Sequence, residues 1–277
     1  MDRKALTFWH QCLGDILRQH DDDAALSALI AHLKGLFRSN SVILMIYRAD
    51  SSPVFLHNDT GHSWRKNNFD DYIAAFYILD PFYQAALSLK EDGLLGLEEI
   101  TPPDFHKSEY FEAWYQQSGL NDEVNFMARL KDGNVVALSL ARTIDAPRFS
   151  PKDLEDMRMI APVVCALLST RCSGGHKETE KGKRLHAELQ SALGAFGRDI
   201  LTPREFEIMQ MLMHGHPTRS VADRLNISME TVKVHRKRIY AKLDIGTHAE
   251  LFSLFLAALE GTDTASGEDP LKAYLGP

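Results

Sequence analysis

The stretch "LTPREFEIMQMLMHGHPTRSVADRLNISMETVKVHRKRIYAKLDIGTHAELFSLFLAAL", residues 201–259, decides the fold of the end of the chain. It contains four short patterns of helical apolar spacing, separated by start and stop signals. Thr202 precedes Pro203 and is followed three residues later by Glu205, which indicates a helix start with a capping box. Gly215 ends this pattern, and "NIS" separates the second helix from the third. A helix, a three-residue turn and a helix form the arrangement that places the second helix in the DNA major groove.

The helix predicted over residues 228–243 is basic, although the whole chain has a formal net charge of -7. Because a helix turns about 100° per residue, Val232 and Ile239 share a packing face with His235 and Leu243, while Lys233 and Lys237 point outward. Outward lysines can donate to guanine edges, and flanking cations can meet phosphates. The predicted DNA-contacting residues are Thr231, Lys233, Val234, His235, Arg236, Lys237, Arg238 and Lys242.

The chain has 277 residues, 44% of them apolar and 25% charged, which is typical of a globular protein with two domains. It has no run of about 18 apolar residues and no secretion signal, so we expect a soluble, cytoplasmic protein without a membrane partner. Cys12, Cys165 and Cys172 lack metal-ligand spacing. No metal or other cofactor is expected.

The first 172 residues predict an α+β sensor domain, an antiparallel sheet flanked by helices, ahead of an all-α four-helix helix-turn-helix domain. The predicted order is a helix pair (8–37), two strands (41–49 and 52–58), helices (69–89 and 104–118), a hairpin around an Asp-Gly turn (123–143) and a long helix (151–171). "SGGHKETEKGKRLH" has linker composition. The predicted domains are 1–172 for ligand sensing and dimerisation, 173–196 as linker, 197–261 for DNA binding and 262–277 as a flexible tail.

Residues 201–259 resemble the C-terminal DNA-binding domain of the LuxR family of transcription regulators. "LTPRE", "VADRLNIS", "TVKVHRKRIYAKL" and "HAEL" carry this resemblance. Ser220 departs from it, since the family commonly has glutamate there, and so does Pro217. The resemblance implies a transcriptional regulator that binds double-stranded operator DNA as a homodimer, with RNA polymerase as a further partner. Leu251, Leu254, Phe255 and Ala258 form an apolar stripe that could serve the dimer.

From about residue 70 to 143 the chain is faintly similar to the autoinducer-binding domain of acyl-homoserine-lactone receptors, through "LDPFY", "YFEAWYQQSGL" and "LSLAR". This resemblance implies that Asp80 accepts a hydrogen bond from a ligand amide and that Ser139 holds a ligand carbonyl. Tyr72 and Phe76 lie near the family's tryptophan and tyrosine, but not in register, and Glu123 replaces a family glycine. The chain thus looks like a LuxR "solo", from a family known for quorum sensing, with a changed pocket.

The predicted ligand site combines aromatic walls with a few polar groups. Its residues are Tyr72, Phe76, Tyr77, Asp80, Trp114, Glu123 and Ser139, and Phe82 and Tyr83 could add further walls. Glu123, beside Asp122 and facing Asp80, adds negative charge that an ammonium group would balance, so we expect a small amine or cationic metabolite. Alternatively, Asp80 caps a helix, or Asp122 and Glu123 lie in a solvated turn or pair with Arg142.

Four other functions compete with that of an amine-sensing regulator. A phosphorylated receiver would need alternating βα units and an acidic pair after its first strand, whereas "DDD" at 21–23 falls between predicted helices. An enzyme could use Asp80, Glu123 and His106 as acid and base, but no nucleophile motif or phosphate-binding loop accompanies them. An acyl-homoserine-lactone receptor, or a first domain that only dimerises or docks a partner, stays open.

Overall fold

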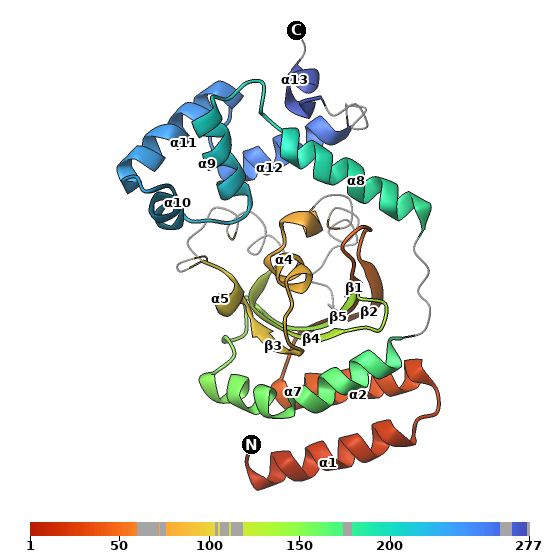
Figure 1. Ribbon diagram of the computed structural model, residues 1–277. Coiled ribbons are helices and arrows are strands. Elements are labelled where there is room, and N and C mark those ends of the chain that lie inside the picture. Colours follow the sequence, from red (N-terminus) through yellow and green to blue (C-terminus); the bar gives the residue numbers. More distant parts are fainter. Residues whose placement is uncertain are drawn as a thin grey trace.

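A computed structural model describes residues 1–59, 72, 76–102, 105, 111, 119–173, 179–260 and 268–275. Its N-terminal part, residues 1–173, is built on a five-stranded antiparallel sheet with the order β2-β1-β5-β4-β3 (Figure 1). The strands are β1 (Ser41–Tyr47), β2 (Val54–Asp59), β3 (Gly93–Gly96), β4 (Leu120–Arg129) and β5 (Val135–Thr143). The predicted α+β class is confirmed, whereas β3 was not predicted. β1 and β5 are neighbours at the centre of the sheet although they are far apart in sequence.

Helices cover both faces of this sheet (Figure 1). One face packs against α2 (Asp22–Phe37) and α7 (Pro151–Arg171), and α1 (Arg3–Arg18) packs on α2. Asp21 caps α2, and Ser150 begins α7 with a capping box. Over the opposite face lie η1 (Phe76–Leu79), α4 (Pro81–Leu87) and α5 (Leu97–Ile100).

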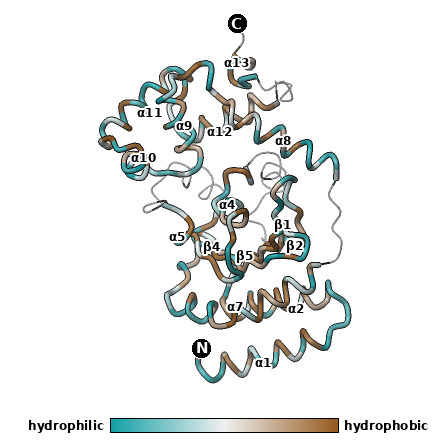
Figure 2. Tube along the Cα trace, in the orientation of Figure 1, coloured by the Kyte–Doolittle hydropathy of each residue, from teal (hydrophilic) through white to brown (hydrophobic). Residues whose placement is uncertain are grey.

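The alternation of side chains along each strand divides the interior into two clusters. Leu44 of β1 and Phe126 of β4 face α2 and α7, together with the residues two positions away on each strand. Met45 and Tyr47 face the other side and join the cluster beneath η1 and α4. Both sides of the sheet are therefore covered, and its central strands are coloured as hydrophobic in Figure 2.

The second part of the chain, hereafter the helical part, comprises α9 (Pro203–Met213), α10 (Thr218–Leu225), α11 (Met229–Leu243) and α12 (His248–Glu260). These are the four predicted helices. Thr202 and Glu205 form the predicted capping box, and Gly215 ends the first helix with a φ of 77°. Asn226 lies between α10 and α11 in the left-handed conformation. The predicted helix-turn-helix is confirmed.

Two segments differ from the predicted linker and flexible tail. α8 (Glu180–Ala195) is a helix of 16 residues whose buried positions include His186, Leu189 and Leu193. Only a narrow stripe of this helix is apolar. Because glycines and charged residues dominate its composition, the helical spacing of the apolar residues is hard to recognise in the sequence. α13 (Pro270–Leu275) is held by Asp269, whose carboxylate accepts N–H bonds from Gly197 and Asp199. Residues 269–275 are thus packed against the helical part.

The three cysteines are free and buried, and burial raises the pKa of Cys165 and Cys172 to about 12. Burial thus disfavours the reactive thiolate form of Cys165 and Cys172. Among the described helices, none is both long and apolar enough to cross a membrane. The described residues also hold no group of three or more histidine, cysteine or carboxylate side chains arranged as metal ligands.

Candidate ligand site and DNA interface

Asp80 lies at the junction of η1 and α4 and uses its two carboxylate oxygens differently. Oδ1 accepts the N–H of Phe82 at 2.8 Å and caps α4, whose first residue is Pro81. Oδ2 accepts the hydroxyl of Tyr72 at 2.5 Å and, more weakly, that of Tyr47 at 3.4 Å. Only 9% of Asp80 is exposed. The helix-cap alternative is confirmed for one oxygen, while the other oxygen faces the interior of the N-terminal part.

Glu123 lies on the same face of the sheet as Tyr47. Its Oε1 accepts the hydroxyl of Ser139 at 2.7 Å and the side-chain amide of Asn125 at 3.0 Å. Asn125 and Ser139 are cross-strand partners on β4 and β5, and both are buried. The register of the two strands thus brings an acid, an amide and a hydroxyl together on one buried face.

The negative charges of Asp80 and Glu123 both raise the pKa of the Tyr47 hydroxyl. The pKa of Tyr47 is raised well above its usual value by burial first, then by the negative charge of Asp80, and to a smaller degree by that of Glu123. Burial also raises the pKa of Asp80, against the opposing hydrogen bonds from Tyr72 and Phe82. A positive group beside these residues would stabilise both ionised carboxylates.

Tyrosine rings line the same region. Tyr83 makes edge contacts with Tyr47 and Tyr77, with centroid distances of 5.7 and 5.2 Å. Phe55 of β2 packs on Tyr72 at 6.1 Å. A cavity of about 740 Å³ adjoins Tyr47, and its other walls come from Ala49, Asp50, Ala86, Leu87, Arg129, residues 132–135 and Lys183.

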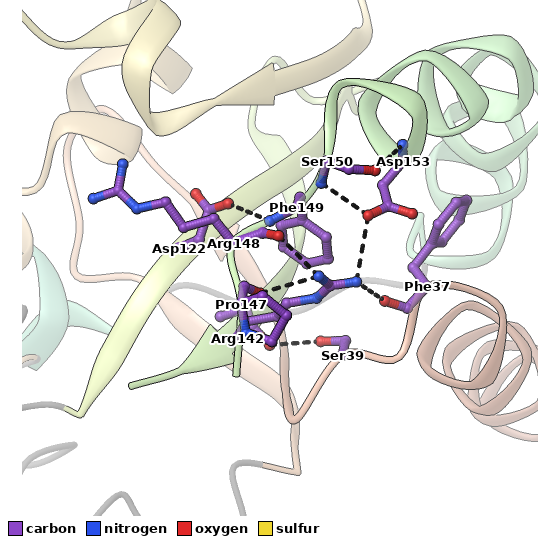
Figure 3. Close-up of polar contacts among 10 residues, drawn as sticks. Phe37, Ser39, Asp122, Arg142, Pro147, Arg148, Phe149, Ser150 and Asp153 are labelled. Carbon is purple, nitrogen blue, oxygen red and sulfur yellow. Dashed lines mark hydrogen bonds and ion pairs between the residues drawn. The ribbon is translucent and has the colours of Figure 1, made fainter. Parts of the chain in front are cut away.

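The alternative in which Asp122 and Glu123 lie in a turn or pair with Arg142 is wrong (Figure 3). Both acids lie within β4, and the carboxylate of Asp122 accepts the N–H of Phe149 at 2.8 Å and the backbone N–H of Glu123 at 3.0 Å. Arg142 donates to three backbone carbonyls and approaches Asp153 at 3.5 Å. Its guanidinium also stacks over the ring of Phe149 at 4.3 Å. The two adjacent acids therefore belong to opposite faces of the sheet.

The predicted ligand-site residues form two groups on one face of the sheet: Tyr72 and Asp80 bond to each other and to Tyr47, and Ser139 bonds to Glu123 further along the strands. Tyr77 lies nearby, but its hydroxyl bonds to His186 of α8. Trp114, His106 and the side chain of Phe76 lie outside the described residues. Tyr47, Asn125 and His186 were not predicted as site residues. Strand alternation could have indicated the first two, because Tyr47 shares the parity of Met45 and Asn125 that of Glu123.

α11 presents the two faces expected from its sequence. Val232, Ile239 and Leu243 are buried, whereas Lys233, Val234 and Lys237 are exposed. Ser228 caps the helix by accepting the N–H of Thr231 at 3.0 Å. Thr231, His235 and Arg236 are half-buried, and Arg238 is exposed. An exposed, mainly basic helix face is therefore available to a nucleic acid.

Lys242, predicted as a phosphate contact, also has a partner within the chain. Its ammonium group lies 2.6 Å from Glu205, a residue that is only 3% exposed and also accepts two bonds from Thr202. Burial raises the pKa of Glu205, but the bonds from Lys242 and Thr202 outweigh burial and hold it at about 2. The ion pair joins α11 to the start of α9, so Lys242 acts within the fold.

The apolar stripe of α12 is also used inside the chain. Leu251, Phe255 and Ala258 are buried, and Leu254 is half-buried. The ring of Phe196 packs on Phe255 at a centroid distance of 5.1 Å, and α13 contacts α12. Packing within the chain therefore accounts for most of this stripe, and Leu254 stays half-buried.

Comparisons with known proteins agree with this architecture. The family described as "Bacterial regulatory proteins, luxR family" matches residues 199–255. An HTH-type transcriptional regulator from the exeN 3' region of Aeromonas salmonicida is 30% identical over 64% of this chain and 93% of its own length. The monoamine regulon transcriptional regulator of Klebsiella aerogenes is 24% identical over 87% of this chain and 94% of its own. The crystal structure of the VqsR LBD domain from Pseudomonas aeruginosa has a TM-score of 0.50 and 26% identity, covering 59% of this chain and 96% of that one.

A sheet-based N-terminal part joined to a helix-turn-helix defines a DNA-binding transcriptional regulator with a sensor-like first part. The chain belongs to the luxR family of bacterial regulatory proteins. Its relatives are transcriptional regulators, and it is a regulator rather than an enzyme.

Proposed function

We propose that this regulator senses a small amine in its N-terminal part and reads operator DNA with α11. The observation that carries the ligand class is the placement of Asp80 and Glu123, whose charges both act on the buried hydroxyl of Tyr47. Asp80 is buried and Glu123 is half-buried on the same side of the sheet, and an ammonium group would offset the cost of burying their charges.

The rest of the site suits the same ligand chemistry. The faces of Tyr47, Tyr72 and Tyr83 can attract an ammonium group through their quadrupoles. Ser139 and Asn125 orient Glu123, and Tyr72 orients Asp80. The apolar body of an amine can pack on the tyrosine rings or extend into the adjoining cavity.

A relative supports the same class of ligand. The regulator from Klebsiella aerogenes is named for a monoamine regulon, and it matches this chain over both parts. An acyl-homoserine lactone is the second candidate, since Asp80 and Ser139 hold the positions that the family resemblance assigns to ligand contacts. A first part that only dimerises or docks a partner is the third.

Calorimetry on the full chain separates these candidates. We expect 2-phenylethylamine to bind and 2-phenylethanol, which has the same ring and chain without the ammonium group, to bind much more weakly. Asp80→Asn and Glu123→Gln should each weaken amine binding by about 1.5 to 3 kcal/mol, the range for a charged hydrogen bond. Asp145→Asn, an exposed acid of the same part, is the matched control.

The competing outcomes are distinct. Tight binding of an acyl-homoserine lactone that Glu123→Gln leaves unchanged would replace the amine by the second candidate. Equal binding of the amine and the alcohol, or no binding of any of the three probes, would contradict the amine proposal.

On the DNA side, we propose that Lys233, Val234 and Lys237 contact bases, while Thr231, His235, Arg236 and Arg238 lie near phosphates. One helix-turn-helix covers one half-site, so a homodimer would bind paired half-sites about one DNA turn apart. The described burial of α12 means that this dimer uses another surface or a rearranged α12. RNA polymerase is the proposed partner at the promoter. Sedimentation with operator DNA tests the dimer, and a single protein chain per operator would contradict it.

A further inference from the structure

α8 spans from the N-terminal part to the helical part (Figure 1). Its first turns lie against the loop after β1. The hydroxyl of Ser52 donates to the carbonyl of Gly182 at 3.5 Å, and a Cβ atom built on Gly182 would lie 2.9 Å from the hydroxyl of Ser51. The backbone of α8 therefore approaches this loop at a distance that only glycine allows without a shift.

His186 is the side chain of α8 that reaches the tyrosines. It is 7% exposed, and its Nδ1 lies 2.9 Å from the hydroxyl of Tyr77. Its ring also packs on Tyr77 and Tyr83, with centroid distances of 6.0 and 6.4 Å. A further hydrogen bond joins the ring to the backbone of Ala49. A neutral imidazole can donate to that carbonyl and accept from the tyrosine, and burial, which lowers the pKa of His186, favours this neutral form.

The other end of α8 is packed into the helical part. Leu189 and Leu193 are buried in the cluster that also contains Ile208 and Met209 of α9. The side-chain amide of Gln210 donates to the carbonyl of Leu193 at 2.8 Å. The same cluster contains Tyr77 and Tyr83, so buried contacts are continuous from the tyrosines to the DNA-reading helices.

We propose that α8 transmits ligand binding from the N-terminal part to the helical part. His186 is the positioning residue through which Tyr77 changes the DNA affinity of the helical part. This inference rests on the proposed ligand site, because Tyr77 packs against both Tyr72 and Tyr83 of that site. A ligand that shifts these rings also shifts the hydroxyl bound to His186. α8 moves as a rigid helix, and it carries that displacement to α9.

Thermodynamic linkage makes the inference measurable. If the contact between Tyr77 and His186 differs between the ligand-free and ligand-bound states, binding of the amine changes the affinity for operator DNA. Operator DNA must then change the affinity for the amine by the same factor. Typical couplings of this kind are about 5-fold to 150-fold.

The test uses the full chain and DNA selected from a random library by the wild-type protein. Fluorescence anisotropy gives operator affinity without amine and at an amine concentration that saturates each variant. We expect 2-phenylethylamine to change wild-type affinity by about fivefold or more. His186→Ala should bring that ratio close to one, and His186→Gln, which can still accept from Tyr77, should restore part of it. Gln190→Ala, an exposed position on α8, should behave as wild type.

A second readout needs no ligand, and it separates failure of this inference from failure of the amine proposal. In the ligand-free chain, His186→Ala should raise hydrogen exchange of the first α8 amides about tenfold, because loosening the helix lowers its opening free energy by about 1.4 kcal/mol. It should also change operator affinity, while Gln190→Ala should change neither quantity. If no amine binds but these effects occur, the coupling stands and the ligand class is wrong. Unchanged exchange and operator affinity in His186→Ala, or an amine response equal to that of wild type, would overturn the coupling.

Discussion

The helix starts of the helical part and the ligand site of the N-terminal part differ in how far apart in sequence their interacting residues lie. In the helical part, the bonds that start α9 and α11 join residues three positions apart, Thr202 to Glu205 and Ser228 to Thr231. In the N-terminal part, Tyr72 reaches Asp80, and the hydroxyl of Tyr47 meets charges from two distant elements. Short local patterns are thus enough to build a DNA-reading surface, whereas the ligand site depends on sheet register and helix docking.

The charged side chains of the two parts also differ in their exposure to solvent. The basic side chains of α11 are mostly exposed, where solvent screens them and substitutions change affinity with little effect on stability. Asp80 and Glu123 lie within or beside the core, where each charge costs free energy unless it is partnered. We therefore expect substitutions on the basic face of α11 to change DNA affinity. Substitutions of Asp80 or Glu123 should change stability or ligand binding.

The largest expected effect is the loss of stability in Gly215→Ala, a substitution that tests the contact between the two parts. Gly215 has a φ of 77°, and a Cβ atom there would lie 2.6 Å from the ring of Phe105. Gly215→Ala should lower the free energy of unfolding by about 2 to 4 kcal/mol, from left-handed strain and overpacking together. Gly35→Ala is the control, since α2 leaves room around Gly35, and it should stabilise the chain by about 0.5 to 1 kcal/mol.

Chemical denaturation measures both variants. In a Phe105→Ala background, Gly215→Ala should cost less than in the wild type, by the share of the loss that comes from overlap between the two parts. An equal cost in both backgrounds would show that backbone strain alone is responsible.

The next effect concerns the exposed face of α11. Lys237→Ala should weaken binding to selected DNA by about 1 to 3 kcal/mol, the range for one lost base contact. Arg238→Ala should weaken selected and random DNA alike and reduce the salt dependence, because a phosphate contact carries no sequence information. Titrations at several salt concentrations distinguish the two, and identical behaviour of both variants would reject the assigned faces.

A pH titration tests the buried acid. Burial raises the pKa of Asp80 in the ligand-free chain, and a bound ammonium group would lower it again. Amine affinity should therefore rise with pH through the pKa of Asp80, by at most about tenfold per pH unit for one proton. Calorimetry in buffers of different ionisation heat should detect proton release. Asp80→Asn should remove this pH dependence, and an unchanged profile in that variant would assign it to another group.

The smallest effect concerns Lys242. Lys242→Ala should destabilise the helical part by about 1 kcal/mol, because the ammonium group is partly exposed and its ion pair is partly screened. Affinity for DNA should change less than in Arg238→Ala. Since the folded pKa of Glu205 is about 2, below its ordinary value of 4.5, its contribution is present above pH 4.5 and is lost as pH falls toward 2. The wild-type advantage over Lys242→Ala should shrink in that window, and an advantage that persists at pH 2 would contradict the assignment.

Much of the fold could be predicted from the sequence because its elements carry strong local signals. The helices of the helical part have caps and stops, and the hairpin of β4 and β5 surrounds an Asp-Gly turn. β3 was missed because "GLLG" is too short to show alternation and is flanked by glycines. α8 was missed because few of its residues are apolar, although His186, Leu189 and Leu193 lie on one face.

The sequence by itself determined the class of the protein, the four helices of the helical part, the packing face of α11 and the sensor-like character of the first part. Only the tertiary structure decided which groups meet: Asp80 bonds to Tyr72 and Tyr47, Glu123 to Ser139, Asp122 to Phe149, and Lys242 to Glu205. The physical reason is the sequence separation over which each kind of interaction acts. Helical periodicity and capping act over three or four residues, whereas a buried charge finds its partner through strand register and helix docking between distant segments.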